Sequence, residues 1–230
     1  MRGPEEHGVV GAWIVEHAVG GAGELHQLEP PPGARRLWVL EPERPAVVLG
    51  STQQVPGIEQ RAAELGLEVV RRRSGGGAVV VRPGEQLWVD LVVPRGDPRW
   101  DDDVERATWW VGEAWANLLA ERGERGRIEV HRRGVTDREL GRLACFAALG
   151  PGEVAVDGRK VVGISQRRTR ELARFQCVVH LRWDPSSLVE VLGVEPGGAL
   201  HRALAERAGS VPLDAPPRGR LVEALVRHLG

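Results

Sequence analysis

Hydrophobic positions between residues 36 and 93 recur in short runs bounded by proline or glycine. Runs of this length that are rich in valine and leucine predict β-strands. We expect strands at 36–40, 46–50, 67–72, 78–81 and 87–93. Between them, residues 56–65 place Ile58, Ala62 and Leu65 on one face, which predicts a helix.

Two further segments show a helical spacing of apolar residues. Residues 9–27 mix Val, Ile, Trp and His at roughly this spacing and predict a helix interrupted near Gly20 and Gly21. The acids at 101–103 suit a helix N-terminus, so the clearest helix of the chain is expected to begin there. Its buried stripe is expected to comprise Val104, Ala107, Val111, Ala114, Trp115, Leu118 and Leu119.

The second half of the chain predicts a β-hairpin and a helical tail. Asp157-Gly158 is a turn signal between apolar runs within residues 153–165, another strand is expected at 175–181, and short helices follow Ser186. Hairpin-like connections favour an α+β fold of the α/β sandwich type, with a mixed, mainly antiparallel sheet and helices packed on it. We expect one domain over 1–185 and a short C-terminal helical segment, 186–230, packed on the same domain.

Composition excludes several classes of protein. A hydrophobic fraction of 42% is enough for a core, and a net charge of −1 gives no general electrostatic reason to bind nucleic acid or an anionic membrane. Cys145 and Cys177 make no disulfide framework, and no Cys/His cluster has the spacing of a metal site. The polar start and the lack of a long apolar segment predict a cytoplasmic protein without a membrane span.

Lys160 stands out because it is the only lysine among 31 basic residues, the others being arginine. Arginine serves most surface and ion-pair roles, but it does not replace a compact ammonium whose point charge must fit a tight site. A single lysine kept in such a chain is either a chance surface residue or a residue with a task that needs lysine chemistry.

The run Ser74-Gly75-Gly76-Gly77-Ala78 lies between two predicted strands and follows three arginines. Glycines in this setting weaken a strand and usually mark a place where a ligand meets the backbone closely. The arginines supply positive charge for a carboxylate or phosphate, so an anionic small molecule is expected along this loop. A flexible glycine hairpin beside solvated arginines is the weaker alternative.

Lys160 itself lies on the predicted hairpin. Strict alternation would place its side chain on the same face as Val162 and Ile164, directed inward. A buried lysine needs a charged partner, and a negatively charged ligand would serve. The alternative is a lysine at the mouth of the hairpin that reaches water.

Three motifs, in order, resemble the lipoate-protein ligase and octanoyltransferase family of the biotin/lipoate protein ligase catalytic-domain superfamily. They span roughly residues 36–183. The motifs are Gly50-Ser51-Thr52-Gln53, Arg71-Arg72-Arg73-Ser74-Gly75-Gly76-Gly77-Ala78-Val79, and Asp157-Gly158-Arg159-Lys160-Val161-Val162-Gly163-Ile164-Ser165-Gln166-Arg167-Arg168.

The resemblance implies an enzyme that attaches a lipoyl or octanoyl group to a lysine of a lipoyl carrier domain through an acyl-adenylate. Lys160 would stabilise charge on the acyl carbonyl and phosphate oxygens. The substrates would be ATP with Mg and lipoate or octanoate, and the partners 2-oxoacid dehydrogenase acyltransferase subunits or the glycine cleavage H protein. The substrate and adenylate site would be formed by Arg72, Ser74, Gly75, Gly76, Gly77, Ala78, Gly163, Ser165 and Gln166.

Two alternatives stay open. Ala144-Cys145-Phe146 resembles an element of octanoyltransferases in which the cysteine carries the acyl group as a thioester, taken from acyl carrier protein without ATP; a small, inert buried cysteine is the competing interpretation. Departures from the family pattern at Trp88, Ile164 and Cys177 suggest instead a member that binds an acyl-adenylate or a carrier domain without turnover.

Overall fold

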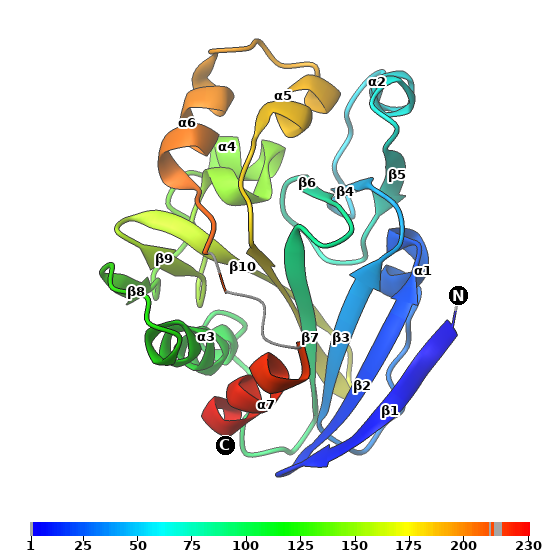
Figure 1. The fold of residues 1–230 in the computed structure, drawn as a ribbon, viewed down its shortest axis with the longest axis vertical. Helices are drawn as coiled ribbons and strands as arrows, with labels where there is room; N and C mark the ends of the chain where they lie inside the picture. Colours follow the sequence, from blue (N-terminus) through cyan, green and yellow to red (C-terminus); the bar gives the residue numbers. More distant parts are fainter. Residues whose placement is uncertain (1, 212, 214–217) are drawn as a thin grey trace.

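A computed structural model describes residues 2–211, 213 and 218–230, and an eight-stranded sheet runs through its centre (Figure 1). Strands β2 and β3 are parallel, and the other neighbours are antiparallel. The expected mixed, mainly antiparallel sheet of an α+β fold is therefore confirmed. In spatial order the strands are β1 (Arg2–Val10), β2 (Trp13–Gly20), β3 (Arg36–Pro42), β7 (Gln86–Pro94), β11 (Leu172–His180), β10 (Arg159–Arg168), β9 (Val154–Val156) and β8 (Ile128–Val130).

Both faces of this sheet are covered. Helices α3 (Trp109–Glu121) and α7 (Arg218–Leu229) pack on one face, the helical face. A small sheet and further helices pack on the other face, the site face. The side chains of β7 alternate between the two: Val89 and Leu91 lie on the helical face, and Trp88 lies on the site face. The elements on the site face are the sheet of β5 (Glu68–Arg71), β4 (Ala46–Leu49) and β6 (Val79–Val81) with α1 (Ala22–Gln27), α2 (Ile58–Glu64), α5 (Ser186–Leu192) and α6 (Ala199–Arg207).

The predicted helix at 9–27 is wrong for most of its length. Residues 2–20 form the hairpin of β1 and β2, and only α1 at the end is helical. Trp13 and Val15 face one side of the sheet and Ala18 the other, which is the alternation of a strand. Gly11 has φ +60 in the turn, a conformation that favours glycine and closes the hairpin.

The helix expected from residue 101 begins later, with a short 3-10 turn at Arg106–Thr108 followed by α3. Asp101 Oδ1 accepts a hydrogen bond from the Asp103 amide, and Asp103 Oδ1 accepts from the amides of Glu105 and Arg106. Aspartate side chains that bond to the following backbone in this way compete with helix formation. Val104 therefore stays outside the buried stripe, with 57% of its surface exposed, while the other expected stripe residues are buried.

The remaining elements agree closely with the hydrophobic pattern. All five strands expected between residues 36 and 93 are present, and the Asp157-Gly158 turn joins β9 to β10. Side chains of α5 and α6 belong to the core on the site face, and those of α7 to the core on the helical face. The proposed boundary at residue 185 stays a prediction. Within the described residues, no helix combines the length and the hydropathy that crossing a membrane requires.

Candidate functional site

The glycine loop that follows β5 lies against the segment that carries Cys145. Ala78 donates its amide to the Leu143 carbonyl and accepts from the Cys145 amide, at 3.0 and 2.9 Å. This approach requires glycine at Gly77, because a Cβ there would lie 2.5 Å from the Ala144 nitrogen. Gly76 has φ +99, which also favours glycine. The glycine run therefore fixes the loop against its neighbour and is not a free hairpin.

Arg72 is buried beneath this loop. Its Nε and Nη2 donate to the Gly75 carbonyl at 3.2 and 2.8 Å, and Nη2 also donates to the Gly77 carbonyl at 2.9 Å. Arg72 was expected beside a ligand carboxylate or phosphate. It also has a structural role, because two of its guanidinium nitrogens donate to the loop carbonyls.

The side chain of Lys160 leaves β10 toward the site face. The register of the β9–β10 pair shifts between Lys160 and Val162, which marks a β-bulge or a similar irregularity. Such an extra residue reverses the alternation. Val162 and Ile164 accordingly contact the core of the helical face, and the expectation that Lys160 shares their face is wrong.

Lys160 is 2% exposed, and acceptors from this chain surround its ammonium. Nζ lies 2.5 Å from Glu153 Oε2 and donates to the carbonyls of Cys145 at 2.7 Å and Ala148 at 3.0 Å. Three acceptors match the three N–H bonds of an ammonium. A ligand anion was expected as the partner of a buried Lys160, but the chain supplies its own partner in Glu153.

Glu153 is 4% exposed and is itself held by backbone amides. Its Oε2 accepts from the Gly150 amide at 2.7 Å and its Oε1 from the Ile164 amide at 3.0 Å. The carboxylate thus has two backbone donors besides its ammonium partner. Glu153 therefore fixes the position of Lys160.

Cys145 begins a short 3-10 turn, Cys145–Ala147, directly after α4 (Arg138–Leu143). Its thiol is half-buried, and Sγ lies 3.8 Å from Lys160 Nζ. The ammonium also lies 5.0 Å from the centre of the Phe146 ring. Cys145 is therefore a reachable thiol beside a fixed positive charge, unlike the fully buried cysteine expected under the inert interpretation.

Two pockets meet at this point. The first, the apolar pocket, has a cavity volume of about 30 Å³, and the second, the open pocket, about 150 Å³. Arg72, Cys145 and Ser165 line both pockets, so these residues form the junction between them.

The linings of the pockets differ in chemistry. The apolar pocket is lined by Val79, Val81, Trp88, Phe146, Gly163 and Val178 together with His26 and Gln176. The open pocket is lined by the glycines of the loop, by Val135 and Gly141, and by the Lys160–Glu153 pair. The first offers mainly apolar contacts, and the second offers the backbone of the glycine loop and an ammonium.

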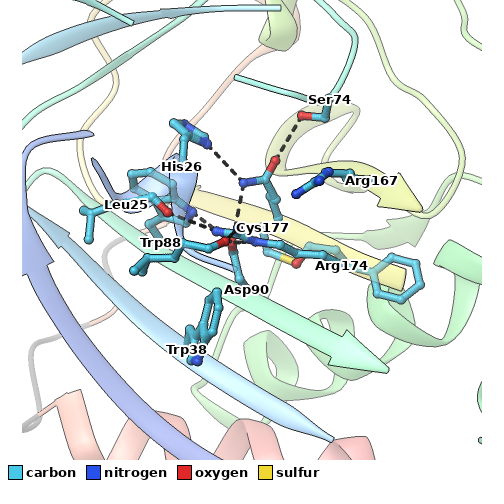
Figure 2. A network of polar contacts seen from close by, with 12 residues as sticks. Leu25, His26, Trp38, Ser74, Trp88, Asp90, Arg167, Arg174 and Cys177 are labelled. Carbon is cyan, nitrogen blue, oxygen red and sulfur yellow. Dashed lines mark hydrogen bonds and ion pairs between the residues drawn. The ribbon is translucent and has the colours of Figure 1, made fainter. Parts of the chain in front are cut away.

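Three members of a buried polar network (Figure 2), His26, Ser165 and Gln176, line the apolar pocket. The Ser74 hydroxyl donates to Gln176 Oε1 at 3.0 Å and lies 3.1 Å from the Ser165 hydroxyl. Gln176 Nε2 lies 3.0 Å from His26 Nδ1, and His26 packs on Trp88 with ring centres 4.5 Å apart. Ser74 and Ser165 are thus brought together as expected, and the network fixes them.

The network continues to a buried ion pair on the site face of the sheet. Arg174 donates to Asp90 Oδ2 at 2.6 Å and to the carbonyls of Leu25 and Leu28 (Figure 2). Trp88 Nε1 donates to Asp90 Oδ1 at 2.8 Å. Burial lowers the pKa of His26 to about 3, with Arg72 and Arg174 adding to the effect, so its imidazole is neutral. A neutral ring suits the wall of a pocket for an apolar chain.

Two residues singled out in the sequence lie outside the site. Gln166 pairs with Phe175, whose ring belongs to the core of the helical face, so Gln166 does not join the other predicted site residues. Cys177 also faces that core, and burial raises the pKa of its thiol. By contrast, Trp88 lines the apolar pocket, and its departure from the family pattern changes the pocket wall directly.

Three residues of the site were not expected from the sequence, namely Glu153, His26 and Gln176. A signal for Glu153 was available, because the Asp157-Gly158 turn pairs Lys160 with Ala155 and brings the start of β9 near the lysine. No comparable signal existed for the other two, since His26 and Gln176 are 150 positions apart in the sequence and meet only through the sheet.

Several solved structures share this fold. Lipoate-protein ligase A bound with ATP is 17% identical, with a TM-score of 0.67 over 96% of this chain and 84% of that one. A bipartite lipoate protein ligase from Thermoplasma acidophilum, studied with its E2 lipoyl domain, is 15% identical, with a TM-score of 0.66 over 93% and 80%. A T. acidophilum structure of this type with bound lipoic acid is 18% identical, with a TM-score of 0.62 over 85% and 71%.

No curated protein sequence matches the chain. The family model described as the lipoyl protein ligase A/B catalytic domain matches residues 24–205, a stretch that contains the glycine loop, Cys145, Lys160 and both pockets. The chain therefore belongs to the lipoyl protein ligase A/B catalytic-domain family.

Proposed function

We propose that this protein attaches a lipoyl or octanoyl group to a lysine of a lipoyl carrier domain. The observation that carries the proposal is the placement of Cys145 where the apolar pocket meets the open pocket, with Lys160 beside it in the open pocket. An acyl chain in the apolar pocket would present its carbonyl carbon at this junction. The target amine would enter through the open pocket.

The apolar pocket supports an acyl substrate. Its valine, tryptophan and phenylalanine side chains form an apolar surface, and burying this surface against a hydrocarbon chain is favourable in free energy. The similar T. acidophilum structure, a putative lipoate protein ligase with bound lipoic acid, also supports an acyl substrate.

The first route passes through an acyl-adenylate. The acyl carboxylate attacks the α-phosphate of ATP, which arrives with Mg bound to its phosphates, and pyrophosphate leaves. The lysine amine of the carrier then attacks the acyl carbonyl, AMP leaves, and the amine gives up a proton. Lys160 stabilises negative charge on the carbonyl oxygen, and the fixed glycine loop lines the place of the adenylate. The likeness to lipoate-protein ligase A bound with ATP supports this route.

The second route uses Cys145, and the half-exposed thiol at the junction favours it specifically. The thiolate attacks the thioester of octanoyl-acyl carrier protein, the carrier thiol leaves, and an octanoyl-Cys145 thioester remains. The target lysine amine then attacks that thioester, an amide forms, and the thiol of Cys145 is regenerated. The Lys160 ammonium lies 3.8 Å from Sγ, close enough to stabilise negative charge that develops during the transfer.

The experiment that tests the proposal is the intact mass of an apo lipoyl domain after incubation with the protein. One sample contains ATP, Mg and lipoate or octanoate, and the other contains octanoyl-acyl carrier protein without ATP. Modification in the first sample alone supports the adenylate route, and modification in the second alone supports Cys145.

A Cys145→Ala variant in both samples separates the routes further, because the adenylate route should survive it. If the folded protein modifies the domain in neither sample, the proposed activity fails. The non-catalytic alternative, binding of an acyl-adenylate or a carrier domain without turnover, then takes its place.

A further inference from the structure

The open pocket is bordered by a surface that carries unpaired positive charge. Arg133, Arg138 and Arg142 are exposed, and Val135 and Leu143 are two exposed apolar residues beside them. We call these five residues the arginine rim. They lie between β8 and Cys145 in the chain, and α4, which carries three of them, lies next to α6 in Figure 1.

Contacts with the pocket place the rim at its mouth. Val135 lines the open pocket and packs against Gly141, where a Cβ would lie 3.6 Å from the valine methyl. Leu143 lies beside the glycine loop, because its carbonyl accepts from the Ala78 amide and from Gln53 Nε2. The rim thus borders the entrance that leads to Lys160 and Cys145.

Neighbouring ion pairs do not neutralise these arginines. Within the described part of the chain, Arg132 pairs with Glu113 and Asp137 pairs with Arg207, but Arg133, Arg138 and Arg142 have no ion-pair partner. Glu139 is the one acid of this segment left without a partner, so the rim keeps a net positive charge. This contrasts with the chain as a whole, whose net charge is −1.

The exposed apolar residues add a second feature of a binding surface. Val135 is 42% and Leu143 is 40% exposed, and they are two of the five large hydrophobic side chains that are exposed in the described structure. Apolar side chains surrounded by unpaired arginines fit a protein surface that combines acidic and apolar groups.

We infer that the arginine rim docks the acidic face of the lipoyl carrier domain that accepts the acyl group. This inference rests on the proposed function, since both routes must bring a carrier lysine through the open pocket. Acidic side chains around the target lysine would meet Arg133, Arg138 and Arg142, while Val135 and Leu143 cover apolar surface. The charge steers the encounter and sets the orientation in which the lysine enters.

The test compares Arg138→Glu/Arg142→Glu with Arg125→Glu/Arg170→Glu. The control arginines are also exposed, have no ion-pair partner in the described structure, and line neither pocket at the junction. Initial rates are measured with the apo lipoyl domain as the varied substrate, at low and at physiological salt. The rim variant should raise KM for the domain about tenfold at low salt, with less effect at higher salt and with kcat nearly unchanged.

The half-reaction without the lipoyl domain separates docking from catalysis. Pyrophosphate release or acyl loading of Cys145 should proceed in the rim variant as in the unchanged protein. An unchanged KM for the lipoyl domain, or an equal rise in the control variant, would overturn the inference. A rise confined to KM for octanoyl-acyl carrier protein would also overturn it, because the rim would then bind the donor.

Failure of the proposed activity is recognised separately, since the unchanged protein would then modify no domain. Calorimetric titration of the apo lipoyl domain into the protein still tests the rim in that case. Weaker binding to the rim variant than to the control variant supports docking, and equal binding refutes it.

Discussion

Lys160 is held as a charged group by the chain itself. Its ammonium has three acceptors, and one of them, Glu153, balances its charge. Removing one partner of a buried ion pair leaves an uncompensated charge, which costs far more than the pair contributes when it is intact. The lysine therefore links stability and reactivity, because two of its acceptors are carbonyls of the turn that presents Cys145.

A double-mutant cycle measures this link. We expect Glu153→Gln and Lys160→Met each to lower the free energy of unfolding by about 3 kcal/mol, because each leaves one buried charge alone. The double variant should lose clearly less than the sum of the two. Urea unfolding of the four proteins gives the coupling energy, and strict additivity of the two losses would contradict the pairing.

The two cysteines should differ in reactivity. Iodoacetamide at neutral pH should alkylate the native protein once, at Cys145, because Cys177 is fully buried and its pKa is raised by burial. Peptide mass mapping locates the adduct, and octanoate in the apolar pocket should slow the reaction. Equal labelling of both residues in the folded protein would show that the placement of the thiols is wrong.

At the scale of elements, the site depends on how the glycine loop meets the segment from α4 to Cys145. Ala78 bonds to both Leu143 and Cys145 across this contact. The loop is further held by Arg72 from below and by Ser74 through its hydroxyl. One side of the open pocket and the position of the thiol are therefore set by a single contact between segments far apart in the sequence.

Two glycines of the same loop offer a matched test of that contact. Gly77→Ala should lower the free energy of unfolding by about 2–3 kcal/mol and reduce activity, because its Cβ would lie 2.5 Å from the Ala144 backbone. Gly75→Ala should have little effect on the free energy of unfolding, since nothing lies within 4 Å of a Cβ there and its φ is not positive. Thermal unfolding and acyl-transfer rates of both variants check this. Similar losses in the two would refute the role of the close approach.

Much of the fold was predictable where local patterns dominate. Short valine-rich runs gave the strands β3 to β7, and the Asp157-Gly158 turn gave the β9–β10 hairpin. The N-terminal hairpin was mistaken for a helix because its apolar residues fall at positions that also fit a helical spacing. In the structure, β2 pairs with β3, a strand outside the local sequence. This pairing decides which side chains of β2 lie on each face of the sheet.

The candidate site was predictable only in part. The glycine loop, Cys145 and Lys160 were found from the motifs, but the face of Lys160 was not, since the register shift next to it reverses the alternation. His26, Gln176 and Arg174 are brought together by strands and a helix from both ends of the chain. Contacts of this kind have no local signal.

At the scale of the whole molecule, the site face of the sheet buries two neutral histidines. Burial lowers the pKa of both His26 and His180 to about 3, and charges from Arg72 and Arg174 act on the first and from Lys160 on the second. His180 packs against the rings of Phe146 and Trp183, which also contact each other. The two imidazoles titrate near pH 6.5 when the chain unfolds.

Stability should therefore fall in mild acid. Between about pH 6.5 and 3 the unfolded chain binds more protons than the folded one, so the stability contributed by neutral burial is complete above 6.5 and decreases as the pH falls. At pH 5 the loss is about 2 kcal/mol for each histidine. Urea unfolding at pH 7.5 and 5.0 measures it, and His180→Phe should roughly halve the difference. If the variant loses as much stability between pH 7.5 and 5.0 as the unchanged protein, His180 does not contribute to the loss.

The single lysine has a consequence for a protein that handles activated acyl groups. With Lys160 buried and bonded to three acceptors, the chain offers no exposed side-chain amine to an acyl-adenylate or thioester that escapes. Self-acylation on surface lysines, a common background reaction of acylating enzymes, has no target here. An acyl mass found on a side chain of this protein, and removed by neutral hydroxylamine, would therefore report a thioester intermediate directly.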